Sequence, residues 1–413
     1  MEEAKVRTYR AALIGIGGFG EHHVKIIEEL VREGSFKLTA FTEIRPEAFP
    51  ATVSLLTRIG AVPYTDYEHM LAEQKDTDFV IIATPISTHK TIATRVMSMG
   101  YHVIVEKPPA VTIQDIDEMI QVQKQTGKKC QVNFQNTSLR SFRQMLSLLE
   151  QGAIGEVTQI TGVGRWRRTK AYYARTPWAG KLTYNGQYVL DGTFTNPLAH
   201  LLNNCLQAAG AISPELMIPQ SVQAELYHVN DIEGDDVSCI RAEMPGQLKV
   251  NFYAMLCHTD NARPFIQVQG SEGSMRWSYD NSLIVRTAKG EEKFQYEEEN
   301  RVRNMYLNLM QAIEDEHVPL YSSIEACRSY VLVSNGVYES ARGVVAIDSQ
   351  YVQEIEAEGS TARLLPALSE QMHDIADRGV LYSEVPFPWA RKTRRVDMRG
   401  YNHFAVTFAG VKS

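Results

Sequence analysis

A lysine followed by two prolines is the pattern in this sequence that best suits acid–base chemistry. Lys107 follows the apolar run His102–Val105, with Glu106 before it and Pro108 after it. Side chains alternate along a strand, so Glu106 and Lys107 point to opposite faces. Pro108 restricts Lys107 to an extended backbone, and a cis bond before it would sharpen the turn. A lysine whose pKa is lowered by burial and charge can move a proton. We expect Lys107 to be catalytic; the alternative is a solvated strand-end lysine.

A glycine-rich turn near the N-terminus suits the phosphates of a dinucleotide. Gly15-Ile16-Gly17-Gly18-Phe19-Gly20 fits G-x-G-x-x-G, after the apolar run 11–14 and before a helical pattern. The first glycine permits a tight turn, the second lets a pyrophosphate approach the backbone, and the third permits close helix–strand packing. Helix N-terminal amides favour anions. The sequence therefore predicts bound NAD or NADP here, against an ordinary strand–helix turn.

Two charged residues after the second expected strand bear on which dinucleotide binds. Glu43 lies 23 residues after Gly20, where the fold places an acid that accepts the ribose hydroxyl of NAD. Arg45 instead suits the 2′-phosphate of NADP. We expect NAD to be preferred, with NADP as the alternative; Glu43 could also be a solvated residue at a strand end.

The elements that must position these residues change in character along the chain. Short apolar runs alternate with helical patterns up to about residue 133, which predicts a doubly wound parallel (Rossmann) sheet. Segments 157–160, 222–227, 237–242, 248–252 and 265–268 then alternate apolar with polar residues, which predicts a mostly antiparallel open sheet. We expect an α/β protein with a dinucleotide-binding domain at 1–133, an α+β domain at 134–360 and a packed C-terminal extension at 361–413. Helices are expected near 197–209, 300–312 and 324–340.

Composition excludes several classes of protein. A chain of 413 residues with 44% hydrophobic and 22% charged residues is an ordinary globular chain of more than one domain. Its net charge of −7 disfavours a nucleic-acid surface. No apolar run approaches the roughly 20 residues that span a bilayer, and the charged first ten residues are unlike a signal peptide. Five scattered cysteines predict a reducing compartment, and we expect a cytoplasmic protein.

Several short motifs together resemble the glucose–fructose oxidoreductase / inositol dehydrogenase (Gfo/Idh/MocA) family. The likeness covers about residues 8–345, and Glu106-Lys107-Pro108 is its most specific part. It implies that Ala83-Thr84-Pro85 passes close to the cofactor ribose and phosphates, and that Glu106 and Lys107 also lie at the cofactor. It further implies that Lys107 takes part in hydride transfer at a sugar or cyclitol. The other residues that carry it are Ala83, Thr84, Pro85, His89 and the segment 151–156. His89 is equally interpretable as a helix-surface residue.

The second expected domain departs from the family pattern. The family carries an Asp and a His four residues apart; here Asp191 is followed at that distance by Thr195, and the next histidine is His200. Pro197 suits the first turn of a helix, with Thr195 or Asn196 as its cap. We expect Asp191 to orient Lys107 or a substrate hydroxyl. His200 either reaches the substrate or faces solvent, and Asn196 either binds substrate or caps the helix.

Aromatic and basic residues cluster before that motif. Arg165 and Arg167 end an expected strand on one face, and Tyr173 and Trp178 follow. They predict a surface for an anionic or hydroxylated substrate, or else a charged edge. Cys257-His258 has no second pair of ligands nearby, so no metal site is expected.

Together these features predict hydride transfer between a nicotinamide and a hydroxyl-bearing carbon of a sugar, cyclitol or derivative. A family enzyme that retains NAD and cleaves a glycosidic bond is one alternative. A non-catalytic dinucleotide or sugar sensor is another, because the usual histidine is missing. An open antiparallel sheet often pairs face to face, so we expect a homo-oligomer, either a dimer or a tetramer.

Overall fold

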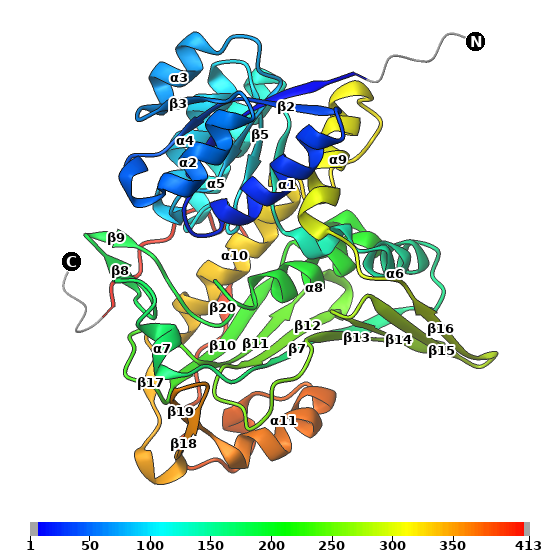
Figure 1. Cartoon of the computed structure of the whole chain (residues 1–413). Coiled ribbons are helices and arrows are strands. Elements are labelled where there is room, and N and C mark those ends of the chain that lie inside the picture. Colours follow the sequence, from blue (N-terminus) through cyan, green and yellow to red (C-terminus); the bar gives the residue numbers. More distant parts are fainter. Residues whose placement is uncertain (1–6, 409–413) are drawn as a thin grey trace. The chain divides into compact units, whose positions relative to one another are not determined.

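The computed structural model describes residues 7–408, which divide into two compact units (Figure 1). The first comprises residues 7–110, 115–135 and 300–325; the second comprises 111–114, 136–299 and 326–408. The division differs from the expected boundaries, because a late segment joins the first unit and the C-terminal extension belongs to the second. Residues 1–6, at the start of the first predicted domain, and residues 409–413, at the end of the predicted C-terminal extension, lie outside the described residues.

The first unit is built on a parallel sheet of six strands in the order β3-β2-β1-β4-β5-β6. Its strands are β1 (Tyr9–Ile14), β2 (Phe36–Thr42), β3 (Val62–Tyr64), β4 (Phe79–Ile82), β5 (His102–Val105) and β6 (Cys130–Val132). Most of their side chains are buried, as a sheet covered on both faces requires. The predicted Rossmann sheet is confirmed.

Helices complete this unit. They are α1 (Gly20–Arg32), α2 (Pro50–Arg58), α3 (Tyr67–Glu73), α4 (Ile86–Ser98), α5 (Ile113–Thr126) and α9 (Arg301–Glu314). The first residues of α5 belong to the second unit. The apolar face of α9, with Val302, Tyr306 and Leu309, lies in the same buried cluster as Leu13 and Ile27. This packing is why the segment joins the first unit.

The second unit contains a mixed sheet in the order β16-β15-β14-β13-β7-β12-β11-β10-β17, with β20 also paired to β10. Its strands are β7 (Val157–Arg165), β10 (Ser221–His228), β11 (Val237–Glu243), β12 (Lys249–Met255), β13 (Phe265–Gly270), β14 (Gly273–Ser278), β15 (Ser282–Thr287), β16 (Gly290–Gln295), β17 (Val345–Ala346) and β20 (Val396–Asp397). Most pairs are antiparallel; β7 with β12 and β10 with β17 are parallel. The predicted mostly antiparallel sheet is confirmed.

Helices and small hairpins surround that sheet. The helices are α6 (Arg140–Glu150), α7 (Lys170–Tyr173), α8 (Ala199–Ile212), α10 (Ile324–Ala341) and α11 (Pro366–Arg378). The hairpins are β8 (Thr183–Tyr184) with β9 (Gln187–Tyr188), and β18 (Gln353–Ala357) with β19 (Ser360–Leu364). Short 3-10 helices lie at Pro46–Ala48, Gln135–Ser138, Pro214–Met217, Pro245–Gln247, Ser349–Tyr351 and Tyr382–Glu384.

Both faces of the central strands are covered (Figure 1). On one face α8 approaches closely, since a Cβ at Gly162 would lie 2.7 Å from the Cys205 Sγ. On the other face α11 and the following segment bury Val163 and Tyr253, with Met372 and Trp389 in the same cluster. Helix α11 and the residues up to Trp389, within the expected C-terminal extension, therefore pack against this sheet. Because this segment covers the central strands, their covered face is not free to pair with a second copy.

No helix within residues 7–408 combines the length and apolar character needed to cross a membrane.

Candidate functional site

The glycine turn joins β1 to α1 as the sequence predicts. A Cβ at Gly15 would lie 2.7 Å from the Ala83 carbonyl oxygen, and one at Gly20 would lie 2.6 Å from the Gly15 oxygen. Gly15 and Gly18 have positive φ, at 88° and 57°, which glycine adopts without strain. The Phe49 ring fills the space that a Cβ at Gly17 would need, whereas Gly18 faces open space. The open approach therefore lies at Gly18 rather than at Gly17.

Glu43 connects the end of β2 to this turn. Its carboxylate accepts hydrogen bonds from the Ile16 amide at 3.3 Å and the Arg45 amide at 3.0 Å. Only 8% of Glu43 is exposed, so the interpretation as a solvated strand-end residue is wrong. Arg45 is exposed. The acid is held beside the glycine turn, where it could also accept a ribose hydroxyl.

This half of the site fits a dinucleotide. Helix α1 begins at Gly20, and its first amides donate to carbonyls of the glycine turn, Gly20 to Gly17 at 2.9 Å and His22 to Phe19 at 3.0 Å. The positive end of the helix dipole still favours phosphate oxygens near this turn. Gly18 leaves room for a backbone approach, and Glu43 supplies an acceptor. Gly15, Gly17, Gly18, Phe19, Gly20 and Glu43 are thus the residues that would hold the pyrophosphate and ribose.

The loop after β4 lies against the same turn. The Ala83 amide donates to the Ile14 carbonyl at 2.9 Å, and the Thr84 hydroxyl accepts from Thr88 at 2.7 Å. His89 is 1% exposed, so it is not a surface histidine. Its ring nitrogens lie 2.8 Å from the Thr84 carbonyl and 2.9 Å from the Pro108 carbonyl. Burial lowers the pKa of His89, while the two carbonyls oppose that effect. His89 therefore links the loops that follow β4 and β5.

Lys107 lies directly after β5 and is half-buried. The Lys107–Pro108 peptide is cis. The preceding residue, Glu106, is 6% exposed, and one of its oxygens accepts from the Lys107 amide at 3.2 Å. Its other oxygen lies 2.9 Å from His23 Nε2 and 2.5 Å from Asn133 Nδ2. Glu106 is thus tied into the interior of the first unit.

Asp191, in the second unit, is held by three donors. Its carboxylate accepts from the Gly180 amide at 2.6 Å, the Asn196 amide group at 2.7 Å and Arg175 at 3.4 Å. Asp191 is 6% exposed. Arg175 also lies over the Tyr172 ring, 3.9 Å from its centroid. Sequence reasoning missed Arg175 and Gly180, whose only signal is their place in a run rich in aromatic residues.

Thr195 occupies the position of the family histidine and turns into its own loop. Its hydroxyl donates to the Leu190 carbonyl and accepts from the Gly192 amide. Helix α8 begins only at Ala199, with Leu198 as its N-cap and no side-chain cap. The prediction that Thr195 or Asn196 caps this helix is therefore wrong, because their side chains bond within the preceding loop and to Asp191.

His200 lies in the first turn of α8 and is half-buried. On the same helix Asn203 and Asn204 are 1% and 0% exposed, and their amide atoms form no hydrogen bond with any residue of the described chain. The polar side of this helix is therefore not a solvated surface.

The four predicted substrate-binding residues before Asp191 contact different segments. Arg167 donates to the Thr259 carbonyl at 3.3 Å, and Arg165 lies near enough to His373 of α11 to contribute to the lowering of its pKa, after burial. Arg165 follows Val163 on the face that α11 covers. Trp178 instead lies with Arg175, at 5.4 Å from its ring. Tyr173 is half-buried, and burial raises the pKa of its hydroxyl.

A buried acid supports the Asp191 loop. Asp235 accepts from the Thr193 amide at 3.0 Å and from the Thr193 hydroxyl at 2.5 Å. Its other oxygen fills the space that a Cβ at Gly192 would need. Burial, with a smaller contribution from Asp236, raises the pKa of Asp235 to about 7. No sequence signal distinguished it from an ordinary turn aspartate.

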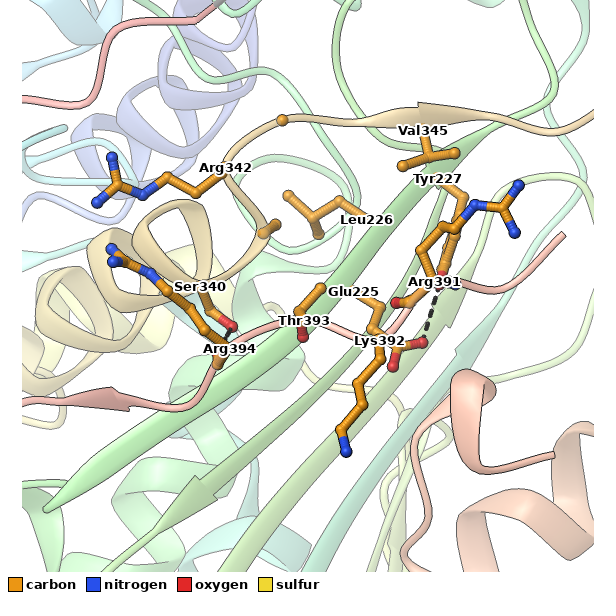
Figure 2. Close-up of a pocket in the computed structure, with 12 residues that line it drawn as sticks. Glu225, Leu226, Tyr227, Ser340, Arg342, Val345, Arg391, Lys392, Thr393 and Arg394 are labelled. Atoms are coloured by element: carbon orange, nitrogen blue, oxygen red, sulfur yellow. Dashed lines mark hydrogen bonds between the residues drawn. The ribbon is translucent and has the colours of Figure 1, made fainter.

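A separate pocket of ≈ 270 Å³ lies at the edge of β10 (Figure 2). Figure 2 shows Arg391 and Lys392 extending away from Arg342 and Arg394. Arg394 is paired with Glu339 at 3.0 Å. These cations do not converge on one point, so the pocket lacks the arrangement of an anion site. Among residues 7–408, no three His, Cys, Asp or Glu side chains gather as a metal site would require.

The chain belongs to the Gfo/Idh/MocA family. Residues 9–134 match the family model described as "Oxidoreductase family, NAD-binding Rossmann fold", and residues 142–276 match the "GFO/IDH/MocA C-terminal domain". The first unit is therefore an NAD-binding Rossmann domain.

Two curated relatives match about two-fifths of the chain. Inositol 2-dehydrogenase of Salmonella typhimurium is 28% identical over 156 residues, which are 38% of this chain and 45% of that protein. A glycosyl hydrolase family 109 protein of Porphyromonas gingivalis is 28% identical over 165 residues, 38% of this chain and 34% of that protein. The match thus spans less than half the length of each relative.

Solved structures resemble the fold over most of the chain. The WlbA dehydrogenase of Bordetella pertussis, in complex with NADH and UDP-GlcNAcA, has a TM-score of 0.67 and 22% identity, and covers 81% of this chain and 97% of its own. Levoglucosan dehydrogenase, in complex with NADH and levoglucosan, has a TM-score of 0.68 and 18% identity, with coverage of 81% and 97%. At these identities the likeness establishes the fold.

Proposed function

We propose that the protein is an NAD-dependent oxidoreductase that acts on a hydroxyl-bearing carbon of a sugar, cyclitol or derivative. The observation that carries this proposal is Lys107 at the end of β5, in the same unit as the glycine turn and Glu43. In an open α/β sheet, ligands bind beyond the carboxyl ends of the strands. The names of the inositol and levoglucosan dehydrogenases support the substrate class.

Some residues of the chain would hold the cofactor, and Lys107 would transfer the proton. NAD supplies the hydride acceptor at its nicotinamide. Lys107 would take the proton from the substrate hydroxyl during oxidation and return it during reduction. Glu43 would favour NAD over NADP, and Arg45 would receive the 2′-phosphate if NADP were used. Ala83, Thr84, Pro85 and His89 would line the cofactor side, and Glu106 would hold the strand end.

Residues of the second unit are proposed to bind the substrate. Asp191 is fixed by three donors and is suited to accept a bond from a substrate hydroxyl. We propose His200 as a second proton carrier and Asn196 as the support of Asp191. Arg165, Arg167, Tyr173, Trp178 and Thr195 complete the proposed substrate-binding set; of these, Trp178 is supported best, because Arg175 lies against both its ring and Asp191.

Replacing Lys107 tests the proposal. The purified protein is mixed with NAD and a panel of sugars and cyclitols, and NADH is followed by its absorbance. We expect turnover with at least one compound, lost in Lys107→Ala while NAD still binds. Lys90→Ala is the matched control, because Lys90 forms an exposed ion pair with Glu118 on the outside of the same unit. Undiminished turnover in Lys107→Ala would contradict the proposed role.

A second candidate is an enzyme that retains NAD and cleaves a glycosidic bond, which the glycosyl hydrolase family 109 relative favours. It predicts release of product from a chromogenic glycoside without net NADH. Binding of NAD with neither activity would instead identify a sensor.

We also propose that the protein works in the cytoplasm, because all five cysteines are buried and none forms a disulfide. A homo-oligomer remains a proposal, and any pairing must use a surface other than the face that α11 covers.

A further inference from the structure

Four polar side chains from separate parts of the chain meet beneath the strand end that carries Lys107. They are His23 on α1, Glu106 after β5, Asn133 after β6 and Tyr306 on α9, with exposed fractions of 0%, 6%, 1% and 0%. Polar groups are costly to bury unless they are paired. Four buried polar side chains in one place therefore indicate a role other than filling the interior.

Hydrogen-bond geometry assigns the protons. A carboxylate only accepts, so His23 Nε2 and Asn133 Nδ2 donate to the same Glu106 oxygen, at 2.9 and 2.5 Å. His23 Nδ1 lies 2.8 Å from the Tyr306 hydroxyl. With its proton on Nε2, His23 accepts from Tyr306 at Nδ1, which fixes the orientation of the ring. The second Glu106 oxygen receives the Lys107 amide at 3.2 Å.

We infer that Glu106 and His23 are positioning residues: they hold the backbone of Lys107 and keep a buried negative charge at the adjoining residue. The inference rests on the proposed function only in taking Lys107 as the proton carrier. His23 lies three residues beyond Gly20, so the same hydrogen bond connects the helix of the glycine turn to the strand end of Lys107. Neither residue needs to touch NAD or substrate for this role.

The charges around Glu106 agree with an ionised carboxylate. Burial raises the pKa of Glu106, but the hydrogen bonds from His23 and Asn133 and the charge of Lys107 outweigh it, so the net shift is downward. The titratable groups that face it are His23 from α1, His89 from α4, Tyr306 from α9 and Lys107 itself. Glu106 supplies the negative charge within this group of side chains.

The test measures the titration of Lys107 in the full chain without any substrate. An amine-selective reagent is applied at a series of pH values, and the labelled fraction of the peptide that contains Lys107 is measured by mass spectrometry. In Glu106→Gln, which keeps the size of the side chain, we expect the labelling midpoint to fall by about one pH unit, because the buried negative charge of the adjoining residue is removed and one unit corresponds to about 1.4 kcal/mol of charge interaction. Glu225→Gln is the matched control, since Glu225 is another buried carboxylate, bound by Ser383 and Tyr227 in the second unit.

A second pair of variants keeps the test decisive if Glu106→Gln does not fold. His23→Leu removes the donor and should lower the midpoint, whereas His23→Gln retains a donor and should restore it. A midpoint in Glu106→Gln or His23→Leu equal to that of the unaltered chain overturns the inference. If the midpoint moves but no sugar or cyclitol is turned over by the unaltered chain, the positioning role stands and the proposed function fails.

Discussion

Asp235 shows how a single buried side chain can support a site without contacting a ligand. Its carboxyl holds Thr193 and occupies the space that a side chain at position 192 would need, so the loop that carries Asp191 has a fixed course. The sequence revealed Asp191 because a short family motif surrounds it, but it offered no indication of Asp235, whose role depends on a contact between residues 42 positions apart. Thr195 illustrates the same limit: its identity is evident in the sequence, whereas its inward hydrogen bonds are not.

The raised pKa of Asp235 predicts a pH dependence of stability. The folded-state pKa of about 7 lies above the ordinary value of 3.8. Between these values the folded chain holds a proton that the unfolded chain has released, so stability should fall as pH rises from about 4 to about 7 and level off above that. Asp235→Asn removes this titration and should flatten the slope of the melting temperature over that interval; Asp236, whose pKa is also raised, leaves a residual slope. An unchanged slope in Asp235→Asn would contradict the assignment.

Glu43 is expected to set the affinity for NAD. Glu43→Ala removes the proposed ribose acceptor and the bond to the Ile16 amide, and hydrogen bonds to charged groups contribute about 1.5–3 kcal/mol each. The dissociation constant for NAD, measured by titration, should rise roughly 10-fold to 100-fold, while that for NADP should change less. Glu47→Ala, at an exposed position four residues on, is the control. Equal losses for both cofactors would contradict the assignment.

At the scale of elements, the sequence predicted best those strands whose residue pattern is set by one requirement, burial on both faces. Strands buried on both faces appear as continuous apolar runs, so β5 was predicted with its observed bounds. Helices α2, α6 and α11 were not predicted, and β14 to β16 were missed, because their patterns are short or mixed and their positions depend on partners distant in sequence. The parallel pairing of β7 with β12 likewise follows from topology rather than from local pattern.

The close approach of α8 to β7 leads to an element-scale prediction. In Gly162→Ala the new methyl would lie 2.7 Å from Cys205 Sγ and 3.3 Å from Leu201, so the helix must shift. Overpacking of this kind costs about 1–3 kcal/mol, which denaturant unfolding would measure. Adding Cys205→Ala should recover part of the loss by removing the sulfur. If the double variant is no more stable than Gly162→Ala alone, the contact is not the cause.

At the scale of the whole molecule, the loss of turnover in Lys107→Ala should leave the stabilisation of the protein by NAD unchanged. A ligand that binds only the folded state at about 100 times its dissociation constant adds about 2.7 kcal/mol of stability. Saturating NAD should therefore raise the melting temperature of the unaltered chain by several degrees, and that of Lys107→Ala equally, although the variant has lost turnover. A smaller shift in Lys107→Ala would show that the lysine also holds the cofactor.

The position of α9 has a consequence for the order in which the protein matures. The helix Arg301–Glu314 completes the apolar interior of the dinucleotide unit and supplies Tyr306, yet it is synthesised after most of the second unit. A ribosome adds about 5–20 residues per second. The interval between residue 135 and α9 therefore lasts roughly 10–35 s, during which part of the apolar interior of the Rossmann unit is not covered by α9. A fragment that stops after residue 135 should accordingly be degraded by proteases more readily than the intact polypeptide, and the capacity to capture NAD should arise late in translation.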